Sequence, residues 1–179
     1  MEGLDRGTGG LLDAIDRLGL ARDTLVLITS DNGADYNGSP GPLRGRKGEV
    51  YEGGQKVPMI ARWPGRITPG RVDDAMAMNI DLFPTLLSLA GLPLPKDRVV
   101  DGRDLSPLLP AEGAQARPHD LLFYFPIVRG SAPAGVRGAR CQYLASTGAP
   151  GRGQPIPTAV PPDQAGAKLH HALPRAGAR

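Results

Sequence analysis

The side chains with the clearest metal-binding chemistry are Asp31 and Asn32, which precede Gly33 and follow the apolar run TLVLIT at residues 24–29. A short, continuous run of aliphatic and β-branched residues predicts a strand buried on both faces, as in a parallel sheet. Ligands of open α/β sheets gather beyond the carboxyl ends of such strands. A carboxylate and a carboxamide there supply the hard oxygen atoms that Ca²⁺ or Mg²⁺ binds. Spacing alone favours a turn, because Asp, Asn and Gly are common turn residues.

The number of oxygen ligands limits what this segment can hold. Ca²⁺ takes about six to eight oxygen ligands and Mg²⁺ about six, of which Asp31 and Asn32 could supply about two or three. The other acidic residues form no obvious completing cluster, because residues 73–74 are predicted to precede a helix, and Asp101 and Asp104 lie in turn-like contexts. The sequence therefore predicts a half-built metal site of weak affinity.

A helix and two strands are predicted to position these residues. Apolar side chains recur at helical spacing before the strand, at Leu11, Leu12, Ile15 and Leu18. Gly19 follows them as a helix terminator. The helix and the strand at residues 24–29 form one αβ unit of a doubly wound sheet. Residues 33–57 form a long Gly-rich loop, a length that usually indicates function or disorder, and residues 59–62 return to the sheet as a strand.

Further elements are predicted in the second half of the chain. Asp81 suits the N-cap of a helix over residues 82–90. The Ser-Pro pair at residues 106–107 suits the cap and first residue of a short helix. Residues 120–125 and 140–145 are predicted to be strands.

Several blocks of residues, in order, carry a family resemblance. They read LITSDNG at 27–33, LRGRKGEVYEGGQKVP at 43–58, MIARWPG at 59–65, NIDLFPTLLSLAG at 79–91 and DGRDLSPLL at 101–109. Together they resemble the type I sulfatases, and within that family the arylsulfatase A-like enzymes. The resemblance begins near residue 3 and fades after about residue 144, so a large part of the chain supports it.

The resemblance implies an α/β fold with three regions. Residues 1–118 correspond to the C-terminal part of the catalytic domain, a partial alkaline-phosphatase/sulfatase-like doubly wound sheet. Residues 119–145 correspond to the start of a smaller C-terminal antiparallel sheet. Residues 146–179 are rich in Pro, Gly and Ala and contain few large aliphatic side chains. That composition predicts a disordered tail.

The resemblance also implies roles for individual residues. Asp31 and Asn32 match metal ligands for Ca²⁺, with Mg²⁺ possible. Asn32 and Lys47 match residues that contact the substrate sulfate, and an ammonium is a compact point charge suited to an oxyanion. Arg44 and Arg46 are predicted to be surface charges rather than ligands.

Two neighbouring features are predicted to be structural. Glu52 is expected to bond loop amides, and Gly53 and Gly54 are expected to allow a positive φ. Trp63 is expected to pack in the interior rather than to form a substrate platform.

The nucleophile of these sulfatases has no counterpart in this sequence. It is a formylglycine made from the Cys or Ser of a C/S-x-P-x-R motif, which lies before the strand that ends in Asp-Asn-Gly. Cys141 has no proline two residues on, and Ser131 and Pro133 are followed by Gly135 where the motif needs arginine. The segment around Ser131 is therefore predicted to be a turn. The Asp-Asp pair that completes the metal site in the family has no counterpart either, so the chain resembles the C-terminal half of a sulfatase.

Three functions remain open at this point. The first is a sulfuric ester hydrolase, arylsulfatase-like, whose nucleophile segment belongs to a longer parent chain. The second is a non-catalytic truncated remnant or a binding fragment. The third, a phosphate ester hydrolase of the same superfamily, fits the Lys-Gly-x-x-Tyr-Glu-Gly-Gly block less well. The sulfate ester itself cannot be identified from these residues, because variable loops determine specificity in such sites.

Composition excludes several partners. Residues 1–128 contain 14 Lys/Arg and 17 Asp/Glu, whereas residues 129–179 contain 7 and 1, so the basic pI comes from the end of the chain rather than from a nucleic-acid-binding face. No apolar run reaches about 18 residues, which predicts no membrane span. The charged first residues lack an apolar h-region, which predicts no signal peptide. The family is often exported, periplasmic or lysosomal, so the compartment is left open.

Overall fold

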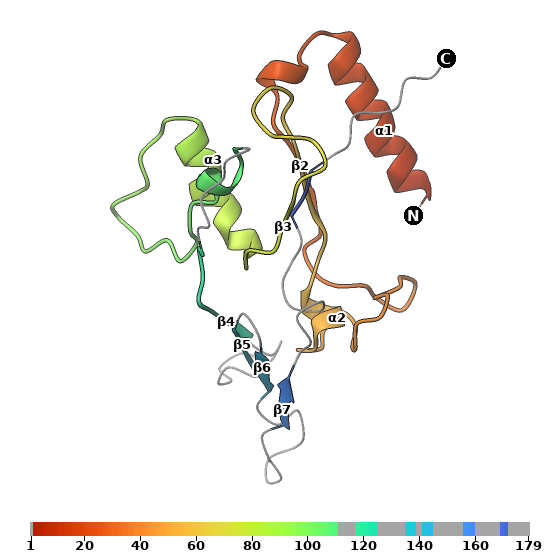
Figure 1. Ribbon diagram of the computed structural model, residues 1–179, viewed down its shortest axis with the longest axis vertical. Coiled ribbons are helices and arrows are strands. Elements are labelled where there is room, and N and C mark those ends of the chain that lie inside the picture. Colours follow the sequence, from red (N-terminus) through yellow and green to blue (C-terminus); the bar gives the residue numbers. More distant parts are fainter. Residues whose placement is uncertain are drawn as a thin grey trace.

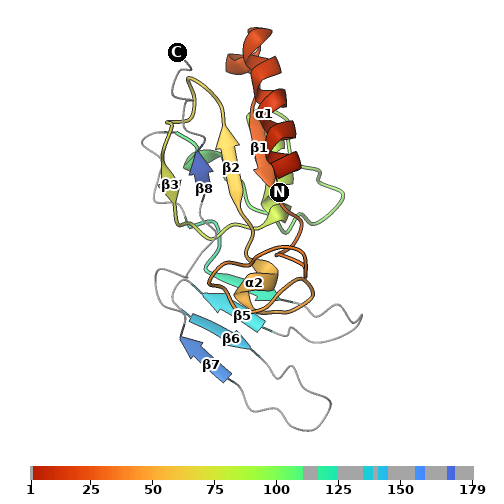
Figure 2. The same cartoon turned by 90° about the vertical axis from the view of Figure 1, so that its right-hand side faces the viewer.

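The computed structural model describes residues 2–110, 117–124, 135–138, 141–144, 156–159 and 169–171. Their strands form two four-stranded sheets (Figures 1 and 2), in the orders β1-β2-β8-β3 and β4-β5-β6-β7. The first contains β1 (Val26–Thr29), β2 (Met59–Arg62), β8 (Leu169–His171) and β3 (Val72–Asp73). The second contains β4 (Leu121–Tyr124), β5 (Gly135–Gly138), β6 (Cys141–Leu144) and β7 (Ile156–Ala159).

Helices lie on both faces of the first sheet and between the two sheets. Helices α1 (Glu2–Arg17) and α3 (Leu82–Leu89) lie on opposite faces of the first sheet, and the single turn α2 (Glu52–Gln55) lies between the sheets (Figures 1 and 2). Short 3₁₀ turns occur at Ala21–Asp23, Asn79–Asp81 and Ser106–Leu108. No helix in the described part of the chain is both long enough and apolar enough to cross a membrane.

The first helix starts earlier than its apolar pattern predicts. It runs from Glu2, with acidic residues in its first turn that favour the positive end of the helix dipole. Its predicted end is confirmed: Gly19 has a φ of 70°, and the Leu20 amide donates to the Ile15 carbonyl at 3.0 Å. Such a left-handed glycine terminates a helix at low steric cost.

The strand that carries the candidate site is present, but its packing differs from the prediction. β1 pairs with β2 in the antiparallel direction, with Val26 opposite Arg62 and Thr29 opposite Met59. Its side chains are half-buried or exposed rather than fully buried. The connection between β1 and β2 is long, but its only helix is the four-residue α2, whereas a parallel pair is usually joined by a longer crossover helix. An apolar run in the sequence does not specify whether the neighbouring strand pairs with it in the parallel or the antiparallel direction. The doubly wound arrangement itself remains a prediction from the family resemblance.

A small apolar core lies around β2. Ala61, Ile67 and Leu109 are buried there, and half-buried side chains pack against them: Leu25, Leu27, Met59, Trp63 and Leu89. The indole Nε1–H of Trp63 donates to the Arg22 carbonyl at 2.8 Å. This contact joins the end of β2 to the turn before β1, and the half-buried Trp63 packs against the core rather than standing free.

Asp81 precedes α3 as predicted, but its carboxylate does not cap the first turn of that helix. It is fully buried and accepts hydrogen bonds from the amides of Met78 (2.6 Å) and Arg103 (2.8 Å). The ring Nε2 of His119 lies 2.8 Å from it. Since a buried carboxylate needs several partners, Asp81 ties three segments together instead.

Elements near the second sheet test the remaining strand predictions. β4 and β6 confirm the strands predicted at residues 120–125 and 140–145. β5 was not predicted, because its glycines at both ends resemble turn residues; the turn predicted around Ser131 lies outside the described residues. Asp73 lies in β3 and pairs with Arg71 at 2.8 Å, rather than simply preceding a helix. β7 and β8 fall within residues 146–179, most of which also lie outside the described part.

Candidate metal and sulfate site

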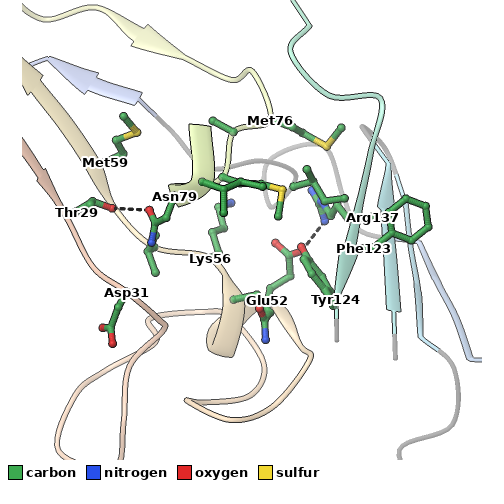
Figure 3. A pocket seen from close by; sticks show the side chains of 16 residues that line it. Thr29, Asp31, Glu52, Lys56, Met59, Met76, Asn79, Phe123, Tyr124 and Arg137 are labelled. Atoms are coloured by element: carbon green, nitrogen blue, oxygen red, sulfur yellow. Dashed lines mark hydrogen bonds and ion pairs between the residues drawn. The ribbon is translucent and has the colours of Figure 1, made fainter. Parts of the chain in front are cut away.

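The turn after β1 is braced by a residue from another part of the chain. The Ser30 hydroxyl donates to the Asn32 carbonyl at 2.9 Å. The Asn79 amide nitrogen donates to the Ser30 carbonyl at 2.8 Å, and the Thr29 hydroxyl donates to the Asn79 side-chain oxygen at 3.4 Å (Figure 3). Asn79 therefore fixes the backbone immediately before Asp31, although nothing in its sequence context indicated that role.

Backbone hydrogen bonds join this turn to the loop that carries Lys47. The amide of Lys47 donates to the carbonyl of Ala34 at 2.9 Å, and the amide of Gly33 donates to the carbonyl of Gly54 at 2.9 Å. The amide of Gly53 donates to the Arg44 carbonyl at 2.7 Å. The turn that carries Asp31 and Asn32 and the loop that carries Lys47 therefore run side by side.

The glycines of this region matter for a different reason from the one predicted. Neither Gly53 nor Gly54 has a positive φ; the positive values fall at Gly45 (86°) and Gly48 (91°), on either side of Lys47. A Cβ at Gly33 would collide with the Gly53 carbonyl, and side chains at residues 53–54 would collide with backbone oxygens of the same loop. These positions need glycine because the backbone segments approach closely.

The arginines of the loop do not act as ligands in this arrangement. Arg44 lies over the ring of Tyr51, 3.9 Å from its centroid, and donates to the Tyr51 hydroxyl at 2.9 Å. Arg46 is half-buried and donates to the carbonyls of Asp35 (2.6 Å) and Gly38 (2.8 Å). The prediction of a surface charge therefore fits Arg44, whereas Arg46 holds the loop together from within.

The oxygen atoms of Asp31 and Asn32 are of the type that a hard divalent cation prefers, but they are fewer than such a cation needs. Asp31 is exposed and Asn32 is half-buried, so both side chains can reach a ligand from solvent. Among the described residues, no group of three or more His, Cys, Asp or Glu side chains converges on one point. Two side-chain oxygen donors compare with the about six to eight that Ca²⁺ takes. Lys47 is also exposed, as a residue that binds an oxyanion must be.

A pocket of about 270 Å³ opens beside this edge (Figure 3). Asp31 lies at its margin, and Glu52, Tyr124 and Arg137 line its deeper end, together with an apolar wall of Met59, Met76, Met78 and Phe123. The Arg137 Nη1 donates to the Glu52 Oε1 at 2.6 Å, and Arg137 is only 2% exposed. Glu52 therefore bonds an arginine of the second sheet, not the loop amides that the sequence predicted.

Burial dominates the electrostatics of this deeper end. Burial raises the pKa of Glu52 despite the opposing positive charges of Arg137 and Lys56. Burial, together with the negative charge of Glu52, raises the pKa of Tyr124 to about 12. Sequence reasoning missed Arg137, because a single arginine between two glycines carries no periodic signal that distinguishes it from a surface residue.

Comparisons with known proteins all find relatives from a single family. A family model described as Sulfatase matches residues 1–92. The chain is 47% identical to mouse (Mus musculus) steryl-sulfatase over 135 residues, which is 70% of this chain and 22% of that protein. It is 46% identical to human (Homo sapiens) arylsulfatase A over 140 residues, 75% and 26% respectively. It is 41% identical to mouse N-acetylgalactosamine-6-sulfatase over 128 residues, 68% and 24%. The chain thus spans about a quarter of these relatives.

Proposed function

Because this chain belongs to the sulfatase family, we propose that it supplies part of the active site of a sulfuric ester hydrolase, including residues that bind a divalent metal and the substrate sulfate. The backbone hydrogen bonds between the Asp31–Gly33 turn and the Lys47 loop are the observation that carries the proposal. They join the segment that offers a carboxylate and an amide to the segment that offers a cation, which supports the proposal. That combination suits a sulfate ester bound to a metal: the carboxylate can bind the positive metal ion, and the ammonium can bind the negative sulfate.

Each residue has a distinct part in this proposal. Asp31 offers a carboxylate to Ca²⁺, or to Mg²⁺, and Asn32 offers either its amide oxygen to the metal or its amide nitrogen to the sulfate. Lys47 directs its ammonium at a sulfate oxygen and balances charge on the group that is transferred. The metal, when bound, would polarise the ester oxygens. Asn79 braces the backbone before Asp31, and Arg46 bonds the Lys47 loop to the carbonyls of Asp35 and Gly38.

The nucleophile must come from another segment. The formylglycine of the family requires a C/S-x-P-x-R motif, which these 179 residues do not contain. We therefore propose that hydrolysis depends on a longer polypeptide that carries such a motif. A non-catalytic binding role is the alternative, and phosphate ester hydrolysis has weaker support because the relatives compared are sulfatases.

Calorimetric titration of the 179-residue chain with Ca²⁺ tests the metal assignment. We expect weak binding that Asp31→Ala abolishes and Asn32→Ala reduces less, because an anionic ligand attracts a divalent cation more strongly than a neutral amide does. Inorganic sulfate, titrated in the presence of Ca²⁺, should lose affinity in Lys47→Ala. Lys96→Ala is the matched control, since Lys96 is exposed and lies outside the loop. Ca²⁺ binding that is unchanged in Asp31→Ala would contradict the assignment.

A further inference from the structure

Two buried contacts join the Lys47 loop to the second sheet. Arg137 of β5 bonds Glu52 at 2.6 Å, and the Gln142 side-chain nitrogen of β6 donates to the Val50 carbonyl at 2.9 Å. Arg137 and Gln142 lie directly opposite each other in the β5–β6 register, so they project from the same face of the sheet. The second sheet is therefore hydrogen-bonded to the loop at two residues, Val50 and Glu52.

The segment that contains Val50 and Glu52 also makes the backbone contacts of the candidate site. Glu52 is the first residue of α2, and the next two residues provide the backbone contacts to Gly33 and Arg44. A helix of one turn has almost no stability of its own, so tertiary contacts must fix its position. Arg137 is 2% exposed, and its charge has Glu52 as an ion-pair partner, so the pair is costly to break from one side.

We propose that Arg137 is a positioning residue that acts through Glu52: it fixes α2 against the Asp31–Gly33 turn, so that the second sheet determines the geometry of the candidate metal and sulfate site. The functional significance rests on the proposed function above, whereas the mechanical coupling does not. Arg137 and Asp31 lie at different ends of the pocket (Figure 3). Arg137 therefore affects the site through Glu52 and not through direct contact with Asp31.

The charges around Glu52 make this role separable from packing. Glu52 faces Arg137 from β5, Lys56 from the end of its own segment and Tyr124 from β4. Replacing Arg137 with methionine keeps most of the side-chain volume and removes one of the two cations near the carboxylate. The variant should then hold Glu52 poorly when it is ionised and better when it is protonated. A residue that only filled space would confer no such dependence on pH.

Amide hydrogen exchange of the 179-residue chain measures the coupling directly. The reporters are the amides of Gly33 and Lys47, which bond the Gly54 and Ala34 carbonyls, and the reference is the amide of Ala90, which bonds the Leu86 carbonyl at the end of α3. We expect Arg137→Met to lower the protection of Gly33 and Lys47 by about tenfold or more near pH 7, with Ala90 changed much less. Arg137→Lys should restore part of the protection. Arg98→Met is the matched control, because Arg98 pairs with Asp97 on the surface.

The pH profile gives the second readout. The loss of protection in Arg137→Met should grow as pH rises above about 4.5, the ordinary pKa of glutamate, and the double variant Glu52→Gln/Arg137→Met should lack this dependence. Unchanged protection of Gly33 and Lys47, or a profile parallel to that of the unsubstituted chain, would overturn the proposal. If Arg137→Met unfolds the whole chain, Arg137→Lys decides: selective loss at Gly33 and Lys47 supports the proposal, and uniform or no loss overturns it.

The calcium titration distinguishes this inference from the proposed function. If Arg137→Met releases Gly33 and Lys47 selectively while Asp31→Ala leaves Ca²⁺ binding unchanged, the coupling stands and the metal assignment fails. If Asp31→Ala abolishes Ca²⁺ binding while Arg137→Met leaves the exchange of both amides unchanged, the metal assignment stands and the coupling fails.

Discussion

Tyr124 and Glu52 are the ionisable residues whose surroundings most affect how the site region responds to pH. Both lie at the deeper end of the pocket, where burial opposes any charged form. Arg137 offsets this effect for the carboxylate by pairing with it at 2.6 Å. The phenol has no comparable benefit, because a tyrosinate would face the negative charge of Glu52. At this point of the fold, the carboxylate of Glu52 therefore faces the positive charges of Arg137 and Lys56.

Tyr124 should ionise at a higher pH than an ordinary phenol. Its pKa is about 12 in the folded chain against 10.0 in an ordinary phenol. A folded pKa above the unfolded one means that the folded state holds the proton more tightly, so stability should fall as pH rises from about 10 to about 12. Ultraviolet titration of the phenolate should show a component near pH 12 that Tyr124→Phe removes. Loss of a component near pH 10 instead would contradict this prediction.

At the scale of elements, the site depends on how closely two loops approach. Gly33 and residues 53–54 lack room for a side chain because backbone oxygens of the facing segment occupy that space. The loop is further closed by Arg46, which bonds two carbonyl groups, and by the positive φ values on either side of Lys47. Lys47 is exposed, yet its backbone is held on both sides. This arrangement gives the loop a defined position without regular secondary structure.

Alanine substitution of two glycines separates close approach from simple flexibility. Gly33→Ala should disrupt the contact with Gly53 and lower the protection of the Lys47 amide from hydrogen exchange, because the new Cβ has no space. Gly10→Ala, in the exposed middle of α1, should instead raise helicity and stabilise the chain by about 0.5–1 kcal/mol. Circular dichroism and exchange measure the two effects. Equal effects of the two substitutions on Lys47 would contradict the close-approach argument.

At the scale of the whole molecule, a large amount of apolar surface is exposed. Leu4 and Leu11 of α1 are 70% and 57% exposed, Leu18 just after it is 68% exposed, and Phe83 and Leu86 of α3 are about half exposed. Both helices lie on faces of the first sheet (Figure 1), yet these side chains remain exposed to solvent. Apolar surface of this kind usually binds a partner or promotes association.

The isolated 179-residue chain should therefore self-associate through this surface. We expect it to bind a hydrophobic dye such as anilinonaphthalene sulfonate and to elute larger than its 18.8 kDa mass on gel filtration. Leu4→Glu together with Leu11→Glu should reduce dye binding, whereas Arg6→Glu on the same helix should not. A sharp cooperative melt with monomeric elution would show that the exposed surface is tolerated.

The same chain should not hydrolyse an aryl sulfate. It lacks the nucleophile motif, and among its described residues no group of three or more His, Cys, Asp or Glu side chains could hold a metal. Losing both contributions removes many kcal/mol of transition-state stabilisation, and each ~1.4 kcal/mol is a tenfold change in rate. Release of nitrophenol from nitrophenyl sulfate should match that of buffer, with or without Ca²⁺. Calcium-dependent turnover that Lys47→Ala abolishes would refute this expectation.

The sequence by itself determined the family, the strands β1, β2, β4 and β6, and the helices α1 and α3. These features depend on local chemistry: an apolar run before Asp31, a glycine after α1, and motifs whose order along the chain is the signal. β2 begins and ends where the pattern predicted, at Met59 and Arg62. Such features need no knowledge of which segments meet.

Only the tertiary structure decided which segments meet and what each partner does. The antiparallel pairing of β1, the partners of Asp81 and the bond between Glu52 and Arg137 all join residues far apart in sequence. A buried charge must find a counter-charge somewhere in the fold, but neither residue's neighbours in the chain specify which one. Glu52 and Arg137 are 85 positions apart, and only folding brings the second sheet against the loop that carries Lys47.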